Sequence, residues 1–170
     1  MAHTVIRGAT ADDYDAVIGS LDEWWGGRPM AAMLPRLFFA HFAPWAYVAV
    51  EAEGPVGFLA AFRSQSDPRQ MYCHFVGVDP RSRGRGVGEA LYQRLFADAL
   101  AQGCAEVLSV TSPVNLGSIR FHQRLGFAPL PGNAAAHGVP FTRDYDGPGE
   151  DRVRFRRPLA PDRTSDSPDD

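Results

Sequence analysis

The amino-acid sequence predicts an α/β protein whose central sheet is mixed and mostly antiparallel, with about seven strands and about four flanking helices. Segments with apolar residues at helical spacing alternate along the chain with segments of strand pattern. The two central strand segments are separated only by Glu53-Gly54, which is typical of a tight hairpin. Because a hairpin joins antiparallel strands, the sheet cannot be wholly parallel.

Length and composition predict one domain. The chain has 170 residues, of which 45% are hydrophobic and 22% are charged. This is enough for one core but short for two domains of ordinary size. We expect the domain to span residues 1–160. Residues 161–170 lack apolar side chains and contain several aspartates, which predicts a disordered acidic tail.

The first third of the chain predicts one strand and two helices. Thr4 to Arg7 has the pattern of a short strand. A helix follows, because Thr10 and two aspartates supply helix-start chemistry before residues at helical spacing, and it ends near Trp24. After Gly26-Gly27 breaks the chain, a second helix is predicted from Pro29 to Pro44.

Three strands are predicted in the middle of the chain. Trp45 to Ala52 and Pro55 to Phe62 form the hairpin, and a third strand runs from about Gln70 to Val78. Alternation along the third strand predicts one face that carries Tyr72, His74, Val76 and Val78. The opposite face then carries Met71, Cys73, Phe75 and Gly77.

The second half continues the alternation of helix and strand. Gly86 to Gly103 is predicted to be a helix, Val107 to Val110 a buried strand, and Asn115 to Leu125 another helix. Pro131 to Gly149 is rich in Gly, Pro and Ala, which predicts a long loop, and Arg152 to Arg156 follows as a terminal strand.

Charge and hydropathy exclude several classes of function. A net charge of −3 gives no general attraction to nucleic acid and no polybasic membrane anchor. No segment approaches the roughly 20 apolar residues of a membrane span, and Thr10 to Asp15 is polar where a signal peptide would be apolar. We expect a cytoplasmic protein with Cys73 and Cys104 reduced and buried. No metal site is predicted.

The most informative segment runs from Val76 to Gly88, where a predicted strand enters a glycine-rich turn and then a helix. Such a turn presents backbone N–H groups, and the helix start adds a positive dipole end, which together suit a phosphate group. Arg81, Arg83 and Arg85 add local positive charge that suits a pyrophosphate.

Two common phosphate loops do not fit this segment. A Walker loop requires Gly-Lys-Ser/Thr, but Glu89 follows Gly88, and a dinucleotide fingerprint would require glycine at position 89. The segment also has the composition of an RNA-binding Arg-Gly tract, but a single copy between a strand and a helix supports that function poorly.

The segment resembles the coenzyme A loop of the GNAT acetyltransferases, whose pattern Arg/Gln-x-x-Gly-x-Gly/Ala is met by Arg83, Gly86 and Gly88. The same family has a second motif about thirty residues later, Asn-x-x-Ser/Ala-x-x-Phe-Tyr-x-x-x-Gly-Phe. Here that motif is matched by Asn115, Ser118, Phe121, Gly126 and Phe127. The resemblance covers Thr4 to Arg156 in element order and Val76 to Phe127 by residue.

The resemblance implies a sheet that splays between the strand ending at Val78 and the strand at Val107. It implies acetyl-CoA as co-substrate and transfer of its acetyl group to a primary amine by direct attack in a ternary complex. The cofactor-binding residues that it implies are Val76, Gly77 and Val78 for pantetheine, Arg83, Gly84, Arg85, Gly86, Val87 and Gly88 for pyrophosphate, and Asn115, Ser118 and Phe121 on the far side.

Two histidines are the predicted catalytic residues. His122 occupies the position where the family most often has a tyrosine that protonates the leaving thiolate, and imidazolium could donate that proton, although water is an alternative. His74 is the predicted base, since the resemblance to the arylalkylamine branch implies a histidine at this strand position. The alternative for His74 is a core histidine bonded to a carbonyl group.

The acceptor is predicted only by class. Trp24 and Trp25 precede a flexible glycine pair and suit the wall of an acceptor pocket, beside Tyr72, although both tryptophans could equally be core residues. We expect a small-molecule amine, with a protein amine as the alternative. A non-catalytic acyl-CoA-binding or regulatory module is the competing class, and formation of a homodimer is left open.

Overall fold

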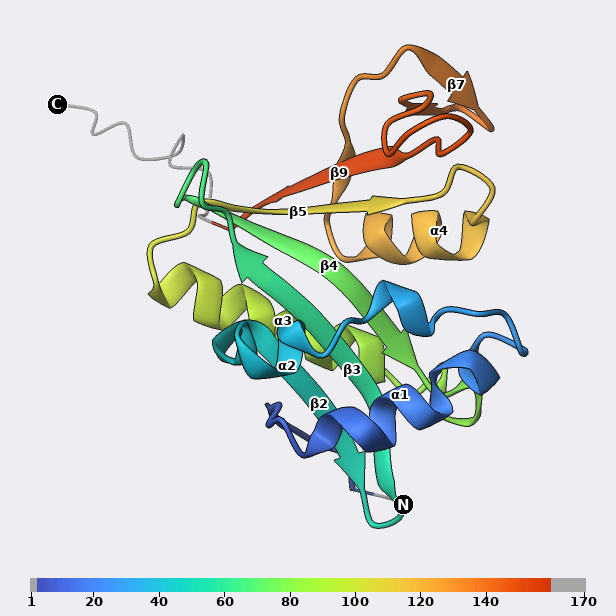
Figure 1. Ribbon diagram of the computed structural model, residues 1–170. Coiled ribbons are helices and arrows are strands. Elements are labelled where there is room, and N and C mark those ends of the chain that lie inside the picture. The colour runs from blue at the N-terminus through green and yellow to red at the C-terminus, as the bar shows by residue number, and fades with distance from the viewer. Residues whose placement is uncertain (1–2, 160–170) are drawn as a thin grey trace, which may run out of the picture. The chain divides into compact units, whose positions relative to one another are not determined.

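The computed structural model describes residues 3–159, so the predicted tail at 161–170 lies outside the described residues. The chain divides into two compact units. Residues 3–65 and 72–98 belong to the first unit, and residues 66–71 and 99–159 to the second. The elements of both units are labelled in Figure 1.

The predicted fold class is confirmed. Seven strands belong to one mostly antiparallel sheet, β1 to β4 in the first unit and β5, β9 and β6 in the second. The described residues also contain four α-helices. No described helix is both long enough and apolar enough to cross a membrane.

The sheet of the first unit is built on the predicted hairpin. β1 (Val5–Gly8) pairs antiparallel with β2 (Ala46–Glu51), which pairs antiparallel with β3 (Gly54–Arg63). Next to β3 lies β4 (Gln70–Val78), whose last seven residues belong to this unit. Gly54 has a φ of 125°, which explains why glycine closes the turn between β2 and β3.

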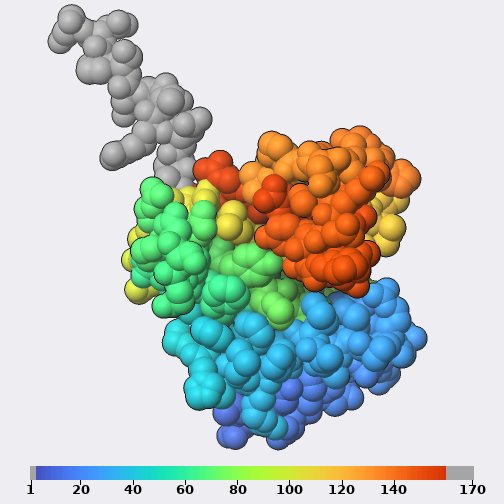
Figure 2. Space-filling model, turned by 45° about the horizontal axis from the view of Figure 1, so that its top comes forward, coloured from blue at the N-terminus to red at the C-terminus, as the bar shows by residue number. Residues whose placement is uncertain are grey.

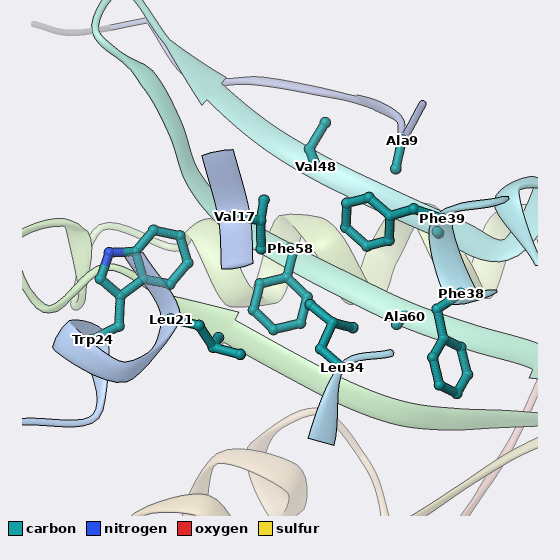
Figure 3. Packing of buried hydrophobic residues seen from close by; sticks show 11 residues of the cluster. Ala9, Val17, Leu21, Trp24, Leu34, Phe38, Phe39, Val48, Phe58 and Ala60 are labelled. Atoms are coloured by element: carbon teal, nitrogen blue, oxygen red, sulfur yellow. The ribbon is translucent and has the colours of Figure 1, made fainter. Parts of the chain in front are cut away.

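One face of this sheet packs against α1 (Asp13–Trp24) and α2 (Leu37–Ala40). In Figure 3 Val17, Leu21 and Trp24 of α1 gather around Phe58 of β3. Val17, Leu21 and Phe58 are fully buried. The apolar stripe of α1 therefore forms the main core of this unit, as the helical spacing predicts.

The predicted helix from Pro29 to Pro44 is wrong. The structure has a short helical turn η1 (Ala31–Met33), then α2, then a second turn η2 (Ala43–Trp45). Pro35 lacks an N–H group and disfavours helical backbone at the residue before it. Leu34 accordingly has φ −125° and ψ 72°, which ends η1.

The other face of the first unit packs against α3 (Val87–Ala101). A Cβ atom added at Gly57 would lie 3.1 Å from a side-chain carbon of Val87 and 3.3 Å from one of Leu91, so β3 and α3 approach closely here. The thiol of Cys73 forms a hydrogen bond with Tyr92 of α3, and burial raises the pKa of this thiol to about 12. The expectation of a buried, reduced Cys73 is confirmed.

In the second unit, three strands of the sheet are covered by one helix. β5 (Glu106–Thr111) pairs antiparallel with β9 (Val153–Pro158), and β9 also pairs with β6 (Ala128–Pro129). The helix α4 (Leu116–Arg124) packs its His122 ring on Phe155 of β9. Cys104 is buried and reduced, as predicted.

The predicted loop from Pro131 to Gly149 is partly wrong. It contains a hairpin of β7 (Ala134–Ala136) and β8 (Val139–Phe141), joined by His137 and Gly138 at positive φ. Figure 2 shows the late residues, coloured orange to red, packed into a continuous body. This turn does not follow from the sequence, because His-Gly is a weaker hairpin signal than Asn-Gly or Asp-Gly.

Candidate functional site

The turn between β4 and α3 begins with an ion pair. The buried Asp79 accepts the backbone N–H of Arg81 at 2.9 Å and starts η3 (Pro80–Ser82). The guanidinium of Arg81 lies 2.8 Å from the same carboxylate, and this hydrogen bond lowers the pKa of Asp79. The charge of Arg81 is therefore already balanced within the protein.

The other two arginines of the turn also have protein partners. Arg83 donates from Nε to the carbonyl of Val78 at 3.1 Å and from Nη2 to the carbonyl of Trp24 at 2.8 Å. Arg85 forms an ion pair with Glu51 at 2.8 Å. Arg83 thus joins the end of β4 to the end of α1, where the last carbonyls lack intrahelical partners.

The backbone of this turn, by contrast, has unused donors. From Gly84 to Gly88, none of the N–H groups has a hydrogen-bond acceptor among residues 3–159. Gly84 and Gly86 have φ of 74° and 81°, and a Cβ atom added at either would meet no atom within 4 Å. Consecutive free donors beside open space, at the start of α3, are an arrangement that suits an anion such as a pyrophosphate.

The prediction of which side chains share a face of β4 is wrong for the residues after His74. The His74 ring stacks on Phe38 of α2, at 4.3 Å between centroids, and the next residue, Phe75, contacts Phe58 and Trp25 on the same side of the sheet. Two consecutive side chains on one face break the alternation, as a β-bulge does. Val76 and Val78 therefore do not share the face of His74.

His74 is oriented by a carbonyl group. Its Nε2 lies 2.6 Å from the carbonyl oxygen of Met33 in η1. Because a carbonyl can only accept, Nε2 carries the proton and donates it. In the neutral ring the unprotonated nitrogen is then Nδ1, which has no hydrogen-bond partner in the described part of the chain.

The predicted substrate-binding residues differ in burial. Trp24 is only 4% exposed and stacks on Phe58, which is the packing of a core residue. Trp25 is half-buried and tilts onto Phe75, at 5.1 Å between centroids, and the half-buried Tyr72 lies beside Phe62 at 5.3 Å. Trp25 and Tyr72 therefore keep surface that a ligand could contact.

Gly77 is required by packing. A Cβ atom there would lie 2.6 Å from ring carbons of both Phe58 and Trp25, which is closer than real atoms approach. Because glycine has no Cβ atom, these two rings can lie directly against β4 close to the turn that follows it.

In the second unit, the motif residues build the start of α4. Asn115 is the N-cap, and its Oδ1 accepts the N–H of Ser118 at 3.1 Å. Asn115 is exposed, whereas Phe121 is half-buried. The capping interaction explains why asparagine occupies this position even without a ligand.

His122 is buried and stacked. The residue is 3% exposed, and its ring lies parallel to Phe155 at 5.0 Å between centroids. Nδ1 donates to the carbonyl of Ser118 at 2.8 Å, so Nε2 accepts from the hydroxyl of Ser109 at 3.2 Å. Burial lowers the pKa of His122, so the neutral ring is favoured.

Two partners of the histidines were missed by the sequence analysis. Ser109 could have been found, because it is the polar residue within the buried strand Val107 to Val110. The carbonyl of Met33 could not, since it belongs to a turn that was predicted to be helix. Among residues 3–159, no group of three or more His, Cys, Asp or Glu residues could hold a metal ion.

Comparison with known proteins identifies one family. The sequence profile of the acetyltransferase (GNAT) family matches residues 14–127. The L-methionine sulfoximine/L-methionine sulfone acetyltransferase of Pseudomonas paraeruginosa is 28% identical over 139 residues, 78% of this chain and 80% of that protein. The L-2,4-diaminobutyric acid acetyltransferase of Nocardia farcinica is 34% identical over 77 residues, 45% of this chain and 40% of that protein.

Solved structures share the fold. A diaminobutyrate acetyltransferase from Paenibacillus lautus, solved with its substrate and coenzyme A, superposes with a TM-score of 0.71 at 18% identity. The match covers 95% of this chain and 99% of that one.

Proposed function

The chain belongs to the acetyltransferase (GNAT) family, and from that premise we propose that it transfers the acetyl group of acetyl-CoA to a primary amine of a small molecule. The observation that carries this proposal is the row of unused backbone N–H groups from Gly84 to Gly88, at the position of the coenzyme A motif. The matched relatives, named for small-molecule acceptors, support the acceptor class.

The cofactor would be held mainly by backbone. We assign the pyrophosphate to the turn Arg83 to Gly88, the pantetheine arm to Val76, Gly77 and Val78, and the far side to Asn115, Ser118 and Phe121. When bound, acetyl-CoA supplies an activated thioester. Since Arg81, Arg83 and Arg85 are already engaged, they contribute by shaping the turn and by local field rather than as free counter-ions.

The state of the two cysteines supports direct attack by the amine rather than an acetylated cysteine intermediate. Both Cys73 and Cys104 are buried, and the raised pKa of Cys73 keeps its thiol protonated, so neither offers a thiolate to carry the acetyl group. The reaction then requires both substrates on the protein together, and the acceptor would contact Trp25 and Tyr72 in the first unit.

His74 is the proposed base. An amine is an ammonium ion at neutral pH, so a proton must leave before attack. With Nε2 donating to the Met33 carbonyl, Nδ1 is the atom that would take this proton, directly or through water. The stacking on Phe38 holds the ring in that orientation.

The proton for the departing thiolate is assigned to water. The sequence prediction gives this step to His122, but its Nδ1 proton is committed to Ser118 and burial disfavours the imidazolium form. His122 as the acid stays a prediction that substitution tests. The burial of His122, which leaves no side-chain acid at this position, is also the observation that favours the competing class, an acyl-CoA-binding module without catalysis.

The deciding experiment is thiol release from acetyl-CoA across a panel of amines, run beside a calorimetric titration with coenzyme A. Binding together with amine-dependent thiol release supports the enzyme. Binding without release from any amine supports the non-catalytic module, and absence of binding contradicts both. A cytoplasmic location and a homodimer stay predictions.

A further inference from the structure

The ring of His74 is oriented by a segment that has few buried contacts of its own. Nε2 of His74 donates to the carbonyl oxygen of Met33, the last residue of η1, at 2.6 Å. None of the three residues of η1 is buried, and the residues from Gly26 to Pro29 that precede it are exposed. A segment with few buried apolar contacts opens easily, so packing alone does not fix the carbonyl group that orients the ring.

The start of η1 is held by Asp22, a residue of the last turn of α1. Oδ1 of Asp22 accepts the backbone N–H groups of Met30 and Ala31, at 2.8 Å and 2.9 Å. Met30 is the N-cap of η1, and its own side chain makes no capping hydrogen bond. The first N–H groups of a helical turn lack partners within the turn, so Asp22 supplies the cap that η1 lacks.

Asp22 is poorly suited to the helix that carries it. A negative charge in the last turn of a helix opposes the helix dipole, and α1 has no basic residue in that turn to compensate. Hydrogen bonds from backbone N–H groups to a carboxylate are, by contrast, stronger than those to a neutral acceptor. The element that Asp22 stabilises is therefore η1 rather than α1.

The end of η1 is held by Tyr14, which also belongs to α1. The hydroxyl group of Tyr14 donates to the carbonyl of Leu34 at 2.8 Å. Leu34 follows Met33 directly, and its side chain is buried in the core drawn in Figure 3. Asp22 and Tyr14 thus hold η1 at both ends, and all of these residues belong to the first unit together with His74.

We propose that Asp22 and Tyr14 are positioning residues for His74. They hold η1, so that the Met33 carbonyl keeps the ring proton on Nε2 and leaves Nδ1 to accept a proton. The hydrogen bond made by one ring nitrogen of a histidine decides which form the other takes. This inference rests on the proposed function, in which His74 is the base. Both residues act through η1, and neither is assigned a contact with a substrate.

The first test observes the ring directly and does not depend on turnover. In the neutral ring, ¹⁵N chemical shifts distinguish a protonated from an unprotonated nitrogen, and the signals of His74 are assigned by their loss in His74→Ala. Wild type should show one tautomer, with the proton on Nε2. In Asp22→Ala and in Tyr14→Phe the ring should sample both tautomers, so its two nitrogen shifts should move towards each other. Tyr14→Phe removes only one oxygen atom and therefore tests the mechanism even if Asp22→Ala does not fold.

Two further variants control for the loss of charge. Glu23→Ala removes the exposed carboxylate next to Asp22 and should leave the shifts of His74 as in wild type. Asp22→Asn keeps an acceptor oxygen on the side chain and should restore most of the wild-type tautomer. Unchanged shifts in folded Asp22→Ala or in Tyr14→Phe would overturn the role of that residue. An equal change in Glu23→Ala would trace the effect to charge and would also overturn the role of Asp22.

The second test is a double-mutant cycle on acetyl transfer. Asp22→Ala should lower kcat/KM about 3- to 10-fold, which corresponds to one net hydrogen bond. In the His74→Ala background the same substitution should have no further effect, because the residue through which Asp22 acts is absent. Equal losses of kcat/KM in both backgrounds would overturn the proposal. If no amine is acetylated, the proposed function fails separately, and the nitrogen shifts alone decide whether Asp22 and Tyr14 orient the ring.

Discussion

The substitution Gly86→Val separates backbone strain from loss of the cofactor site. Gly86 has a φ of 81°, which valine adopts with difficulty, yet an added Cβ would meet no protein atom within 4 Å. The change therefore leaves packing intact and places a branched side chain in the space beside the free N–H groups. Gly138 offers a matched control, with a φ of 76°, similar open space and a position in the β7–β8 turn.

Two magnitudes follow from this geometry. A non-glycine residue in left-handed backbone costs about 1–3 kcal/mol, so both variants should lose a similar free energy of unfolding. Only Gly86→Val should lose cofactor contacts. If two hydrogen bonds to the charged pyrophosphate are broken, at about 1.5–3 kcal/mol each, affinity for coenzyme A should fall by roughly 100-fold or more.

The assay is a calorimetric titration with coenzyme A on both variants, beside chemical unfolding. We expect equal destabilisation, normal affinity in Gly138→Val and strongly reduced affinity in Gly86→Val. Unchanged affinity in Gly86→Val would refute the assignment of the pyrophosphate to this turn. An equal loss of affinity in both variants would mean that destabilisation, rather than the blocked approach, causes the effect.

Four further predictions concern the histidines and Gly77. The rise of kcat/KM with pH should be lost, and its plateau lowered about 100-fold or more, in His74→Ala, because a general base contributes that much; an unchanged profile would make His74 a packing residue. His122→Phe should keep turnover within a few-fold, since the neutral His122 holds no spare proton; a larger fall in turnover than in coenzyme A affinity would restore His122 as the acid. Folding lowers the pKa of His122, so its contribution to stability is complete above its unfolded pKa of about 6.5. This contribution is lost as the pH falls towards the folded pKa. The free energy of unfolding of His122→Phe should therefore depend less on acidification than that of wild type. Gly77→Ala should lose about 1–3 kcal/mol of unfolding free energy through overpacking against Phe58 and Trp25, whereas Gly19→Ala in α1, where the added atom meets nothing, should lose none.

The parts of the fold that follow from local chemistry could be predicted. α1 was predicted to end near Trp24 and β4 to end at Val78, because glycine and proline stop both elements there. The helix predicted from Pro29 does not form as one piece, because Pro35 interrupts it despite the apolar spacing. The β7–β8 hairpin could not be predicted, because β7 consists of alanine, a residue with little preference for strands, and β8 contains a proline.

The candidate site divides in the same way. The glycine-rich turn could be singled out from sequence, and Gly84 and Gly86 adopt positive φ there, a backbone conformation that favours glycine. Side-chain partners do not follow from sequence. Strand alternation predicted that His74 shares a face with Val76, but the bulge after it reverses the pattern, and only the packed rings of Phe38 and Phe75 reveal this.

The two kinds of residue in the coenzyme A motif serve different purposes. Arg83 was read as a phosphate ligand, yet its guanidinium donates to the carbonyls of Trp24 and Val78 and so ties the turn to the end of α1. Gly86 and Gly88 leave their N–H groups unpaired instead. The side chain thus fixes the shape of the turn, and the shaped backbone supplies the donors. Affinity for the cofactor should therefore depend on the conformation of the turn more than on its arginine side chains, since Arg81 and Arg85 are paired with carboxylates and Arg83 donates to two carbonyl groups.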